Sequence, residues 1–177
     1  MNAPAQLIDE STVPSVRQVL GGYLERSESA DFAVARVRLA GIDLEPEEFY
    51  RLHTCRLLLG RFDADTLAEM TSGPARDHVE GLRRFLATGR LHIRAAGVGA
   101  WSPDFSIIQT TDGPRLLVGG HYFGRPEPAG GTVFTCVLSE PDAVDRARER
   151  FGQLWEAGYD VIPVIRAALE NAAAPEP

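Results

Sequence analysis

The stretch WSPDFSIIQTTDGPRLLVGGHYFGR, residues 101–125, combines the pattern of a β-hairpin with a polar loop flanked by glycines. Residues 104–110 alternate polar and apolar side chains, and residues 115–118 form a second apolar run. Between them, residues 111–114 read TDGP, which is typical of a tight turn. The loop GGHYFG, residues 119–124, follows the second strand, and its bare backbone allows a ligand to approach closely. The sequence therefore places a candidate site in this loop.

The composition is typical of an ordinary globular domain. The chain has 177 residues, 44% of them hydrophobic and 24% charged, which is enough to bury one core. The net charge of −7 disfavours direct binding to nucleic acid, because that binding relies on clustered cationic side chains. All 18 basic residues are arginine, so no mechanism here uses a lysine.

The cysteines, the spacing of possible metal ligands and the N-terminal residues predict the location of the protein in the cell and its cofactors. Cys55 and Cys136 each lie in an apolar run without CxxC spacing, which predicts two buried free thiols. No group of residues has the spacing of a metal site, and we expect no metal and no cofactor. No apolar run has the length of a membrane span, and MNAPAQLIDES lacks the order of a signal peptide. These features predict a cytoplasmic protein that does not bind membranes.

Strands and helices alternate along the chain before the hairpin. The predicted strands are residues 31–40, 55–60, 91–95, 104–110, 115–118 and 132–138, with a turn at 27–30. The predicted helices are residues 13–26, 45–50, 63–70, 72–88 and 161–172, with a further long helix that starts at 139–142. Asp63 or Asp65 can cap the helix that ends near residue 70, and Gly89 is the expected left-handed stop of the next one. This order predicts right-handed crossovers and a mainly parallel sheet. We expect a flexible lead-in over residues 1–12, a single domain over 13–172 and a disordered tail over 173–177.

This order of elements resembles one half of a phospholipase D-like domain. The matching landmarks are the strands at 30–41, 55–60 and 91–94, the segment 104–124, and the closing FGQLWE at 151–156. The resemblance covers residues 15–160. It implies an α/β fold, a phospholipase D-like sandwich with a mainly parallel mixed central sheet flanked by helices. Single-half members of this family pair across a two-fold axis, so the resemblance also implies a homodimer.

The catalytic signature of that family is degenerate in this chain. Active members carry His-x-Lys-x4-Asp at the start of the hairpin, and their histidine forms a covalent phosphoenzyme. In the register that points polar residues into the site, the three positions hold Asp104, Ser106 and Thr111. A register shifted by one residue gives Phe105, Ile107 and Asp112. Neither register supplies a suitable nucleophile or a cation for the phosphoryl oxygens, so we expect the family reaction to be absent.

A closer likeness is to degenerate domains of this fold that follow helix-turn-helix regions in regulators of high-GC bacteria. The shared residues are Ser106 and Ile107, followed by LVGGHYFGRP at 117–126. This likeness implies a sensing, regulatory or partner-binding role. Residues 1–12 are too few for a DNA-reading domain, so we expect this chain to regulate through another protein.

Eight residues of the hairpin, the loop and the third strand are candidate ligand contacts. They are His121, Tyr122, Gly119, Gly120, Asp104, Ser106, Arg94 and Arg125. A loop histidine can donate, accept or ligate, or be fixed by a carbonyl to shape the loop. Asp104 and Ser106 share one side of their strand, where they line either a binding site or a solvated face. Arg94 and Arg125 can hold an anion through their planar guanidinium groups, or balance the charge of nearby aspartates.

Three hypotheses about function follow from these residues. The leading one is a non-catalytic module that binds a small anionic ligand or a protein partner around His121. The alternative is an enzyme with altered phosphodiesterase or hydrolase chemistry, in which His121 acts as base or nucleophile beside Asp104. In the third, the chain is a structural subunit that docks through Tyr122 and Phe123.

Overall fold

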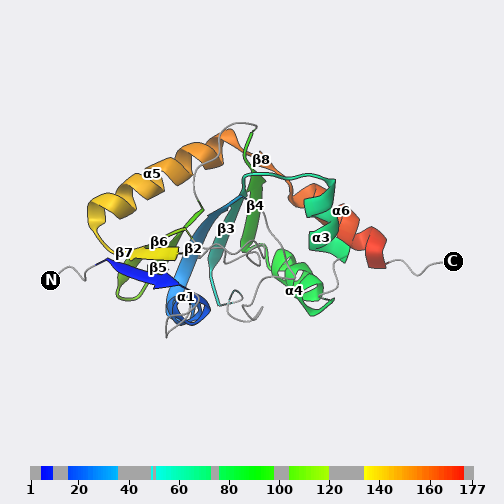
Figure 1. Ribbon diagram of the computed structural model, residues 1–177. Helices are drawn as coiled ribbons and strands as arrows, with labels where there is room; N and C mark the ends of the chain where they lie inside the picture. Colours follow the sequence, from blue (N-terminus) through cyan, green and yellow to red (C-terminus); the bar gives the residue numbers. More distant parts are fainter. Residues whose placement is uncertain are drawn as a thin grey trace.

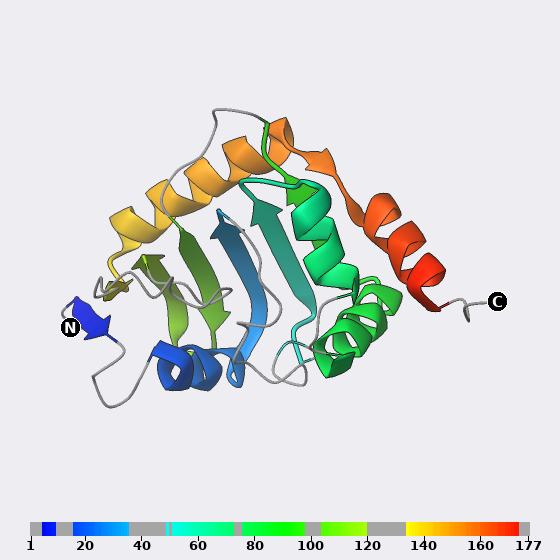
Figure 2. The ribbon, with the colours of Figure 1, turned by 45° about the vertical axis from the view of Figure 1, so that its right-hand side comes forward.

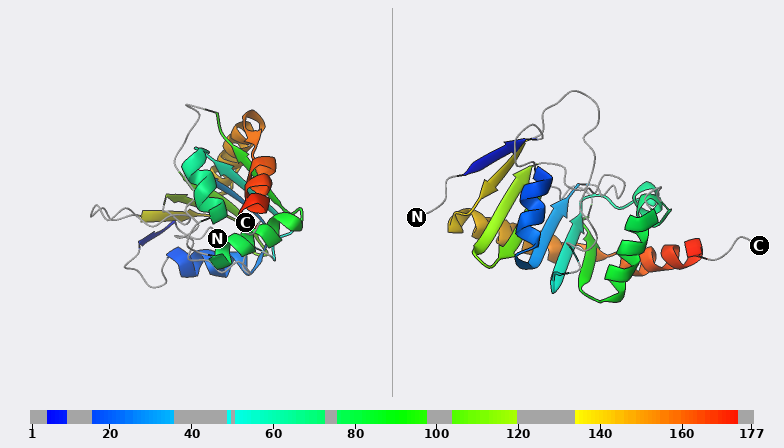
Figure 3. Two further views of the ribbon diagram at one scale, coloured as in Figure 1. Left: turned by 90° about the vertical axis from the view of Figure 1, so that its right-hand side faces the viewer. Right: turned by 90° about the horizontal axis from the view of Figure 1, so that it is seen from below.

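The computed structural model describes residues 5–9, 16–35, 49, 51–72, 76–97, 104–119 and 134–173. Within these residues, the strands form one eight-stranded sheet with helices on both faces (Figure 1). The strand order is β1-β7-β6-β5-β2-β3-β4-β8, which the right-hand view of Figure 3 shows from β1 (blue) to β4 (green). The fold is therefore α/β with a mixed sheet, as the sequence predicts.

The two halves of the sheet differ in strand direction. β2 (Ser27–Val34), β3 (Thr54–Leu59) and β4 (Leu91–Ala95) run parallel. The other strands pair antiparallel: β5 (Phe105–Thr110), β6 (Gly113–Gly119), β7 (Phe134–Leu138) and β1 (Gln6–Asp9) on one side, and β8 (Tyr159–Asp160) on the other. Parallel pairing is thus confined to these three strands. The prediction of a mainly parallel sheet is wrong, because most pairs among the described strands are antiparallel.

The helices divide between the two faces of this sheet. α5 (Pro141–Ala157) crosses one face, which we call the α5 face (Figure 2). The other face, called the α1 face, carries α1 (Val16–Leu24), α3 (Ala64–Ser72), α4 (Arg76–Ala87) and α6 (Ile162–Ala173). In Figure 1, α5 lies above the sheet and α1 lies below it.

Successive side chains along a strand point to opposite faces of the sheet, so each face has its own hydrophobic core. On β2, the Phe32 side chain joins the core of the α1 face, whereas the next residue, Ala33, packs in the core under α5. On β3, Leu57 and Leu58 divide between the faces in the same way. Both faces of the parallel strands are therefore buried over much of their length, which explains their nearly continuous apolar sequence.

Several predictions about local structure are confirmed. β4 covers residues 91–95, as its sequence pattern indicates. Asp63 caps α3, because its Oδ1 accepts a hydrogen bond from the Thr66 backbone N–H at 2.9 Å. Gly89 follows α4 with φ of +70°, the left-handed conformation predicted for a helix stop.

Other predictions need correction, mainly at the start of the chain. Residues 6–9, expected within a flexible lead-in, form β1, because Leu7 and Ile8 pair with β7 and Ile8 becomes buried. Residues 27–30, expected as a turn, are the first half of β2, where pairing with β5 and β3 overrides the weak strand propensity of serine and glutamate. The hairpin turn contains only Thr111 and Asp112, since Gly113 already pairs with Thr110.

The structure describes both cysteines and shows whether its helices could span a membrane. Both cysteines are free, but only Cys55 is buried, whereas Cys136 is half-buried. Burial raises the pKa of the Cys55 thiol, with a smaller contribution from Asp31. Among the helices described here, none is long and apolar enough to cross a membrane.

Candidate functional site

Asp104 fixes the geometry at the start of the hairpin. Its backbone carbonyl accepts a hydrogen bond from the Gly119 N–H at 2.8 Å, which joins the beginning of β5 to the end of β6. Its side-chain Oδ1 accepts a second bond, also 2.8 Å long, from the backbone N–H of Ala35, directly after β2. Asp104 therefore sits at the sheet edge where the parallel strands end, which is where α/β sheets commonly bind ligands.

Ser106 lies on the α1 face of β5. It shares that side of the strand with Ile108, which belongs to the core of the α1 face. The neighbouring residues Phe105 and Ile107 pack instead in the core under α5. The register with Asp104 and Ser106 therefore places its strand positions on the α1 face, whereas the shifted register places Phe105 and Ile107 in the core under α5.

Thr135 on β7 completes this group, although the sequence did not single it out. Its strand partner is Gly119, which in turn lies beside Asp104. Gly119 has no side chain and a φ of +80°, so the backbone alone separates Asp104 from Thr135. We call Asp104, Ser106, Gly119 and Thr135 the hairpin site.

The hydroxyl groups of Ser106 and Thr135 are both completely buried, with 0% exposure. Neither Ser106 Oγ nor Thr135 Oγ1 has a hydrogen-bond partner among the residues that the structure describes. Most buried hydroxyls in proteins are hydrogen-bonded, because leaving one unpaired costs about 1 to 3 kcal/mol. Thr135 is the strand partner of Gly119 and Ser106 is that of Leu117, so both hydroxyls belong to the same end of the hairpin and make it a candidate binding site.

The structure separates Arg94 from the hairpin site. Arg94 pairs with Leu58, and Leu58 packs in the core under α5, so the Arg94 side chain lies on the α5 face. Its Nη1 donates to the Trp155 carbonyl oxygen at 2.5 Å, and its Cζ lies 5.6 Å from the centroid of the Trp155 ring. Arg94 is therefore engaged by α5, whereas Ser106 faces α1.

The α5 face holds a cluster around Arg56 that consists of one ion pair and two aromatic contacts. Arg56 donates to both carboxylate oxygens of Asp31, from Nε at 2.7 Å and from Nη2 at 2.6 Å. Its Cζ also lies 4.8 Å from the Phe151 ring centroid. The hydrogen bond to Asp31 raises the pKa of Arg56, and partial burial opposes it. These contacts pair the charges and anchor α5, so we assign the cluster to stability.

The remaining predicted ligand contacts follow Gly119 in the sequence. Gly120, His121, Tyr122 and Arg125 lie outside the described residues, and so does Phe123. Asp112, the third position of the shifted signature register, forms an ion pair with Arg26 at the far end of the hairpin. Asp104, Ser106 and Gly119 are thus the predicted site residues that the structure brings together.

Comparison with known proteins identifies the fold. No family model and no curated protein matches the chain. Among solved structures, Nuc from Salmonella typhimurium, a phospholipase D family member, superposes with a TM-score of 0.55 at 12% identity, over 89% of this chain and 97% of Nuc. NucT from Helicobacter pylori gives a TM-score of 0.56 at 6% identity, over 89% of this chain and 98% of NucT.

A third similar structure is a larger protein. TrmBL2, an archaeal chromatin protein with a novel mode of DNA binding, gives a TM-score of 0.54 at 14% identity. The match covers 90% of this chain but only 54% of TrmBL2, so the chain spans about half the length of that protein. Together these structures show that the chain has the phospholipase D-like fold, as the sequence resemblance predicted. At such low identities they show the fold alone.

Proposed function

We propose that the chain is a non-catalytic phospholipase D-like module that binds a small anionic ligand at the hairpin site, in a sensing or regulatory role. The observation that carries the proposal is the pair of fully buried hydroxyls on Ser106 and Thr135, which lack partners among the described residues. Each hydroxyl has one proton to donate, and ligand oxygens are suitable acceptors. His121 and Arg125 follow Gly119 by two and six positions, and we assign to them the complementary positive charge.

The chemistry of the site favours binding over turnover. The resemblance aligns the family's histidine and lysine with Asp104 and Ser106. Asp104 Oδ1 accepts the Ala35 N–H, and the Ser106 hydroxyl is hydrogen-bonded to no base among the described residues that could remove its proton. The sequence contains no lysine, and Arg94 lies on the other face. Negative charge develops on the phosphoryl oxygens in the transition state of the family reaction, and these residues provide no cation to stabilise it.

The test is a thermal-shift screen of the purified protein against nucleotides, phosphorylated metabolites and simple oxyanions. A ligand present at about a hundred times its dissociation constant adds about 2.7 kcal/mol to the free energy of unfolding. That increase raises the melting temperature by several degrees. Ser106→Ala and Thr135→Val remove the two hydroxyls while keeping most of the side-chain volume, and we expect both variants to lose the shift.

Thr110→Val is the matched control for these variants. The Thr110 hydroxyl is bonded to the Gly113 carbonyl oxygen at 2.6 Å, at the opposite end of β5, so its removal should leave the ligand shift intact. Equal shifts in the wild type and both site variants would overturn the proposal. Cleavage of a phosphodiester that is lost in His121→Ala would establish the enzyme alternative instead. If no compound shifts the protein, docking through Tyr122 and Phe123 becomes the better explanation.

The proposal includes the homodimer that the family resemblance implies. Sedimentation equilibrium across a range of protein concentrations gives the mass directly. A mass of twice 19.3 kDa is expected, and a monomer at every concentration would remove this part of the proposal.

A further inference from the structure

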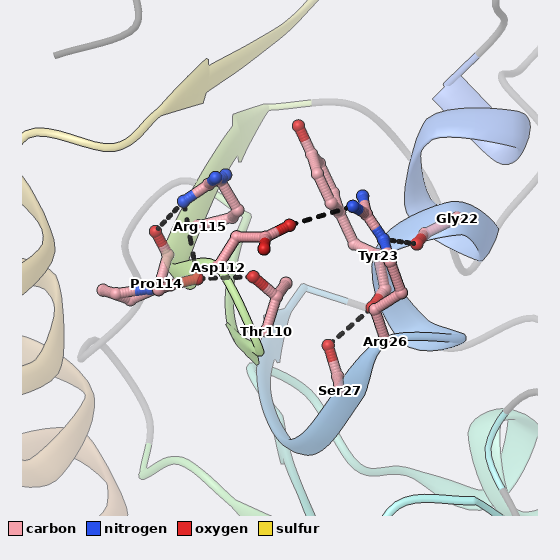
Figure 4. Close-up of polar contacts among 9 residues, drawn as sticks. Gly22, Tyr23, Arg26, Ser27, Thr110, Asp112, Pro114 and Arg115 are labelled. Carbon is pink, nitrogen blue, oxygen red and sulfur yellow. Dashed lines mark hydrogen bonds and ion pairs between the residues drawn. The ribbon is translucent and has the colours of Figure 1, made fainter. Parts of the chain in front are cut away.

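A second polar cluster lies where the last turn of α1 meets the β5–β6 turn (Figure 4). The end of the helix is closed by its own side chains, since Ser27 Oγ donates to the Tyr23 carbonyl oxygen at 2.6 Å. Arg26 Nε donates to the Gly22 carbonyl oxygen at 3.0 Å. The cluster is thus built on a defined helix terminus and a tight turn, at the end of β5 opposite to Asp104.

Two arginines flank the ring of Tyr23 in this cluster. The guanidinium carbon of Arg26 lies 5.9 Å from the ring centroid, and that of Arg115 lies 6.0 Å from it. In Figure 4 the Tyr23 side chain stands between the two guanidinium groups. Cation–π attraction holds both charges against the same ring, so the three groups are arranged before any ligand arrives.

Some N–H groups of Arg115 form no hydrogen bond to the described residues. It projects from β6 on the α1 face, beside Ile108 of β5. Its Nη1 donates to the carbonyl oxygens of Pro114 at 3.0 Å and of Gly113 at 3.4 Å. Within the described part of the chain, no carboxylate pairs with it, and no acceptor meets its Nε or Nη2. A half-buried guanidinium without a counter-charge is a favourable position for an anion.

The hydroxyl of Tyr23 adds a further donor. It forms no hydrogen bond to any residue that the structure describes, although the Tyr23 carbonyl is bonded to Ser27. The three functional groups therefore offer one hydroxyl and two guanidinium groups on one side of a protein whose net charge is −7. A concentration of donors of this kind is unusual on an acidic surface and fits an oxyanion.

Arg26 forms an ion pair with Asp112, whose carboxylate would compete with a bound anion. Its Nη1 lies 3.0 Å from Asp112 Oδ2, and the two side chains are 52% and 60% exposed. Exposed ion pairs of this kind contribute little to stability, so an incoming anion can replace the carboxylate. Asp112 is thus the counter-ion of the cluster in the absence of ligand.

We propose that Arg26, Tyr23 and Arg115 form a second binding site, separate from the hairpin site, for a phosphate monoester. The phosphate oxygens accept from Arg115 Nε and Nη2, from the Tyr23 hydroxyl and from Arg26, while Asp112 is displaced. The site does not depend on the proposed function, because it shares no residue with the hairpin site.

The experiment follows the arginine side-chain Nε–H signals by NMR while inorganic phosphate is added at low ionic strength. We expect saturable shifts at Arg115 and Arg26. Arg146 is the internal control, since its Nε donates to the Asp142 carbonyl oxygen of its own helix. A parallel titration with sodium chloride separates binding from ionic screening.

Two substitutions are expected to change the affinity for phosphate in opposite directions. Arg115→Gln removes a charge-assisted donor pair and should weaken phosphate binding by about tenfold or more. Asp112→Asn removes the competing carboxylate and should tighten binding by about two- to fivefold, an increase that misfolding cannot mimic. Wild-type affinity in Arg115→Gln, or unchanged or weaker affinity in Asp112→Asn, would overturn the proposal. Arg146→Gln, at an arginine that belongs to neither proposed site, should leave phosphate binding unchanged.

Glycerol phosphate and vesicles that contain phosphatidic acid distinguish the two sources of a phosphate monoester. Saturation by glycerol phosphate without cosedimentation on vesicles assigns a soluble ligand. Cosedimentation that Arg115→Gln abolishes assigns a lipid headgroup. Binding of neither compound, with no saturable response to inorganic phosphate, would rule the site out.

Discussion

The two faces of the sheet differ in whether their polar side chains are hydrogen-bonded. On the α5 face, Arg56 is bonded twice to Asp31, and Arg94 is bonded to the Trp155 carbonyl. On the α1 face, the Ser106 and Thr135 hydroxyls are fully buried and have no partner among the described residues. The same sheet therefore carries hydrogen-bonded polar groups on the α5 face, on β2, β3 and β4, and unpaired hydroxyls on the α1 face, on β5 and β7.

This difference separates stability from binding. A paired buried group keeps its neighbours in place, whereas an unpaired one costs free energy that only a partner can recover. Substitutions on the α5 face should therefore change the free energy of unfolding. Substitutions of the hairpin-site hydroxyls should change ligand binding and leave unfolding almost unaffected.

The largest loss of stability is expected for Phe151→Ala. The Phe151 side chain is 1% exposed, stacks on Trp155 with centroids 5.6 Å apart, and meets Phe105 edge-on at 6.3 Å. Removing the ring leaves a cavity, and we expect a loss of about 3 to 5 kcal/mol in the free energy of unfolding. Urea denaturation followed by circular dichroism measures it, with Phe151→Leu as the milder control. A loss below about 1 kcal/mol would show that α5 does not anchor this face.

A smaller loss is expected for Arg56→Gln, which breaks the ion pair to Asp31. The Arg56 side chain is 37% exposed and that of Asp31 is 18% exposed, so solvent screens part of the interaction. We expect a loss of about 1 to 2 kcal/mol, between the values for exposed and buried pairs. A double-mutant cycle with Asp31→Asn should give a coupling energy of about 1 kcal/mol. Strict additivity of the two substitutions would contradict this interpretation.

Gly119→Ala tests the hairpin site at its glycine. A φ of +80° disfavours any residue with a Cβ, so we expect the free energy of unfolding to fall by about 1 to 2 kcal/mol. The added methyl group should also abolish the ligand-induced shift. Gly22→Ala in α1 is the matched control, because alanine favours the helix and, among the described residues, no atom beyond the adjacent helix backbone lies within 4 Å of the added Cβ. Equal effects of the two substitutions would argue against a special role for Gly119.

The smallest effect on stability is expected for Ser106→Ala. The lost hydroxyl has no partner among the described residues, so its removal breaks no hydrogen bond that stabilises the fold. We expect the free energy of unfolding of the ligand-free protein to stay within about 0.5 kcal/mol of wild type, or to increase. A loss of more than about 1 kcal/mol would show that the hydroxyl already has a structural partner.

Local sequence patterns were enough to predict most elements and part of the site. β4, the Asp63 cap and the left-handed Gly89 depend on residues close in sequence, and all three are confirmed. Asp104 and Ser106 were predicted from strand alternation and the family resemblance, and the structure brings both together with Gly119.

Long-range pairing explains what the sequence did not reveal. Thr135 looked like any β-branched residue of a core strand, and only its pairing with Gly119 brings it to the hairpin site. The position of Arg94 on the α5 face depends on which side of the sheet each helix covers, which no local pattern specifies. β1 was missed because four residues give too little alternation, and its pairing partner lies more than a hundred positions away.

The central claim is tested most directly by mapping a ligand from the thermal-shift screen with backbone amide NMR. We predict that the largest saturable shifts fall at Asp104, Ser106, Gly119 and Thr135, while the amides of Arg56 and Arg94 stay unchanged. Ser106→Ala should abolish these shifts without changing the rest of the spectrum. Shifts centred on the α5 face, or an unchanged response in Ser106→Ala, would contradict the assignment of binding to the hairpin site.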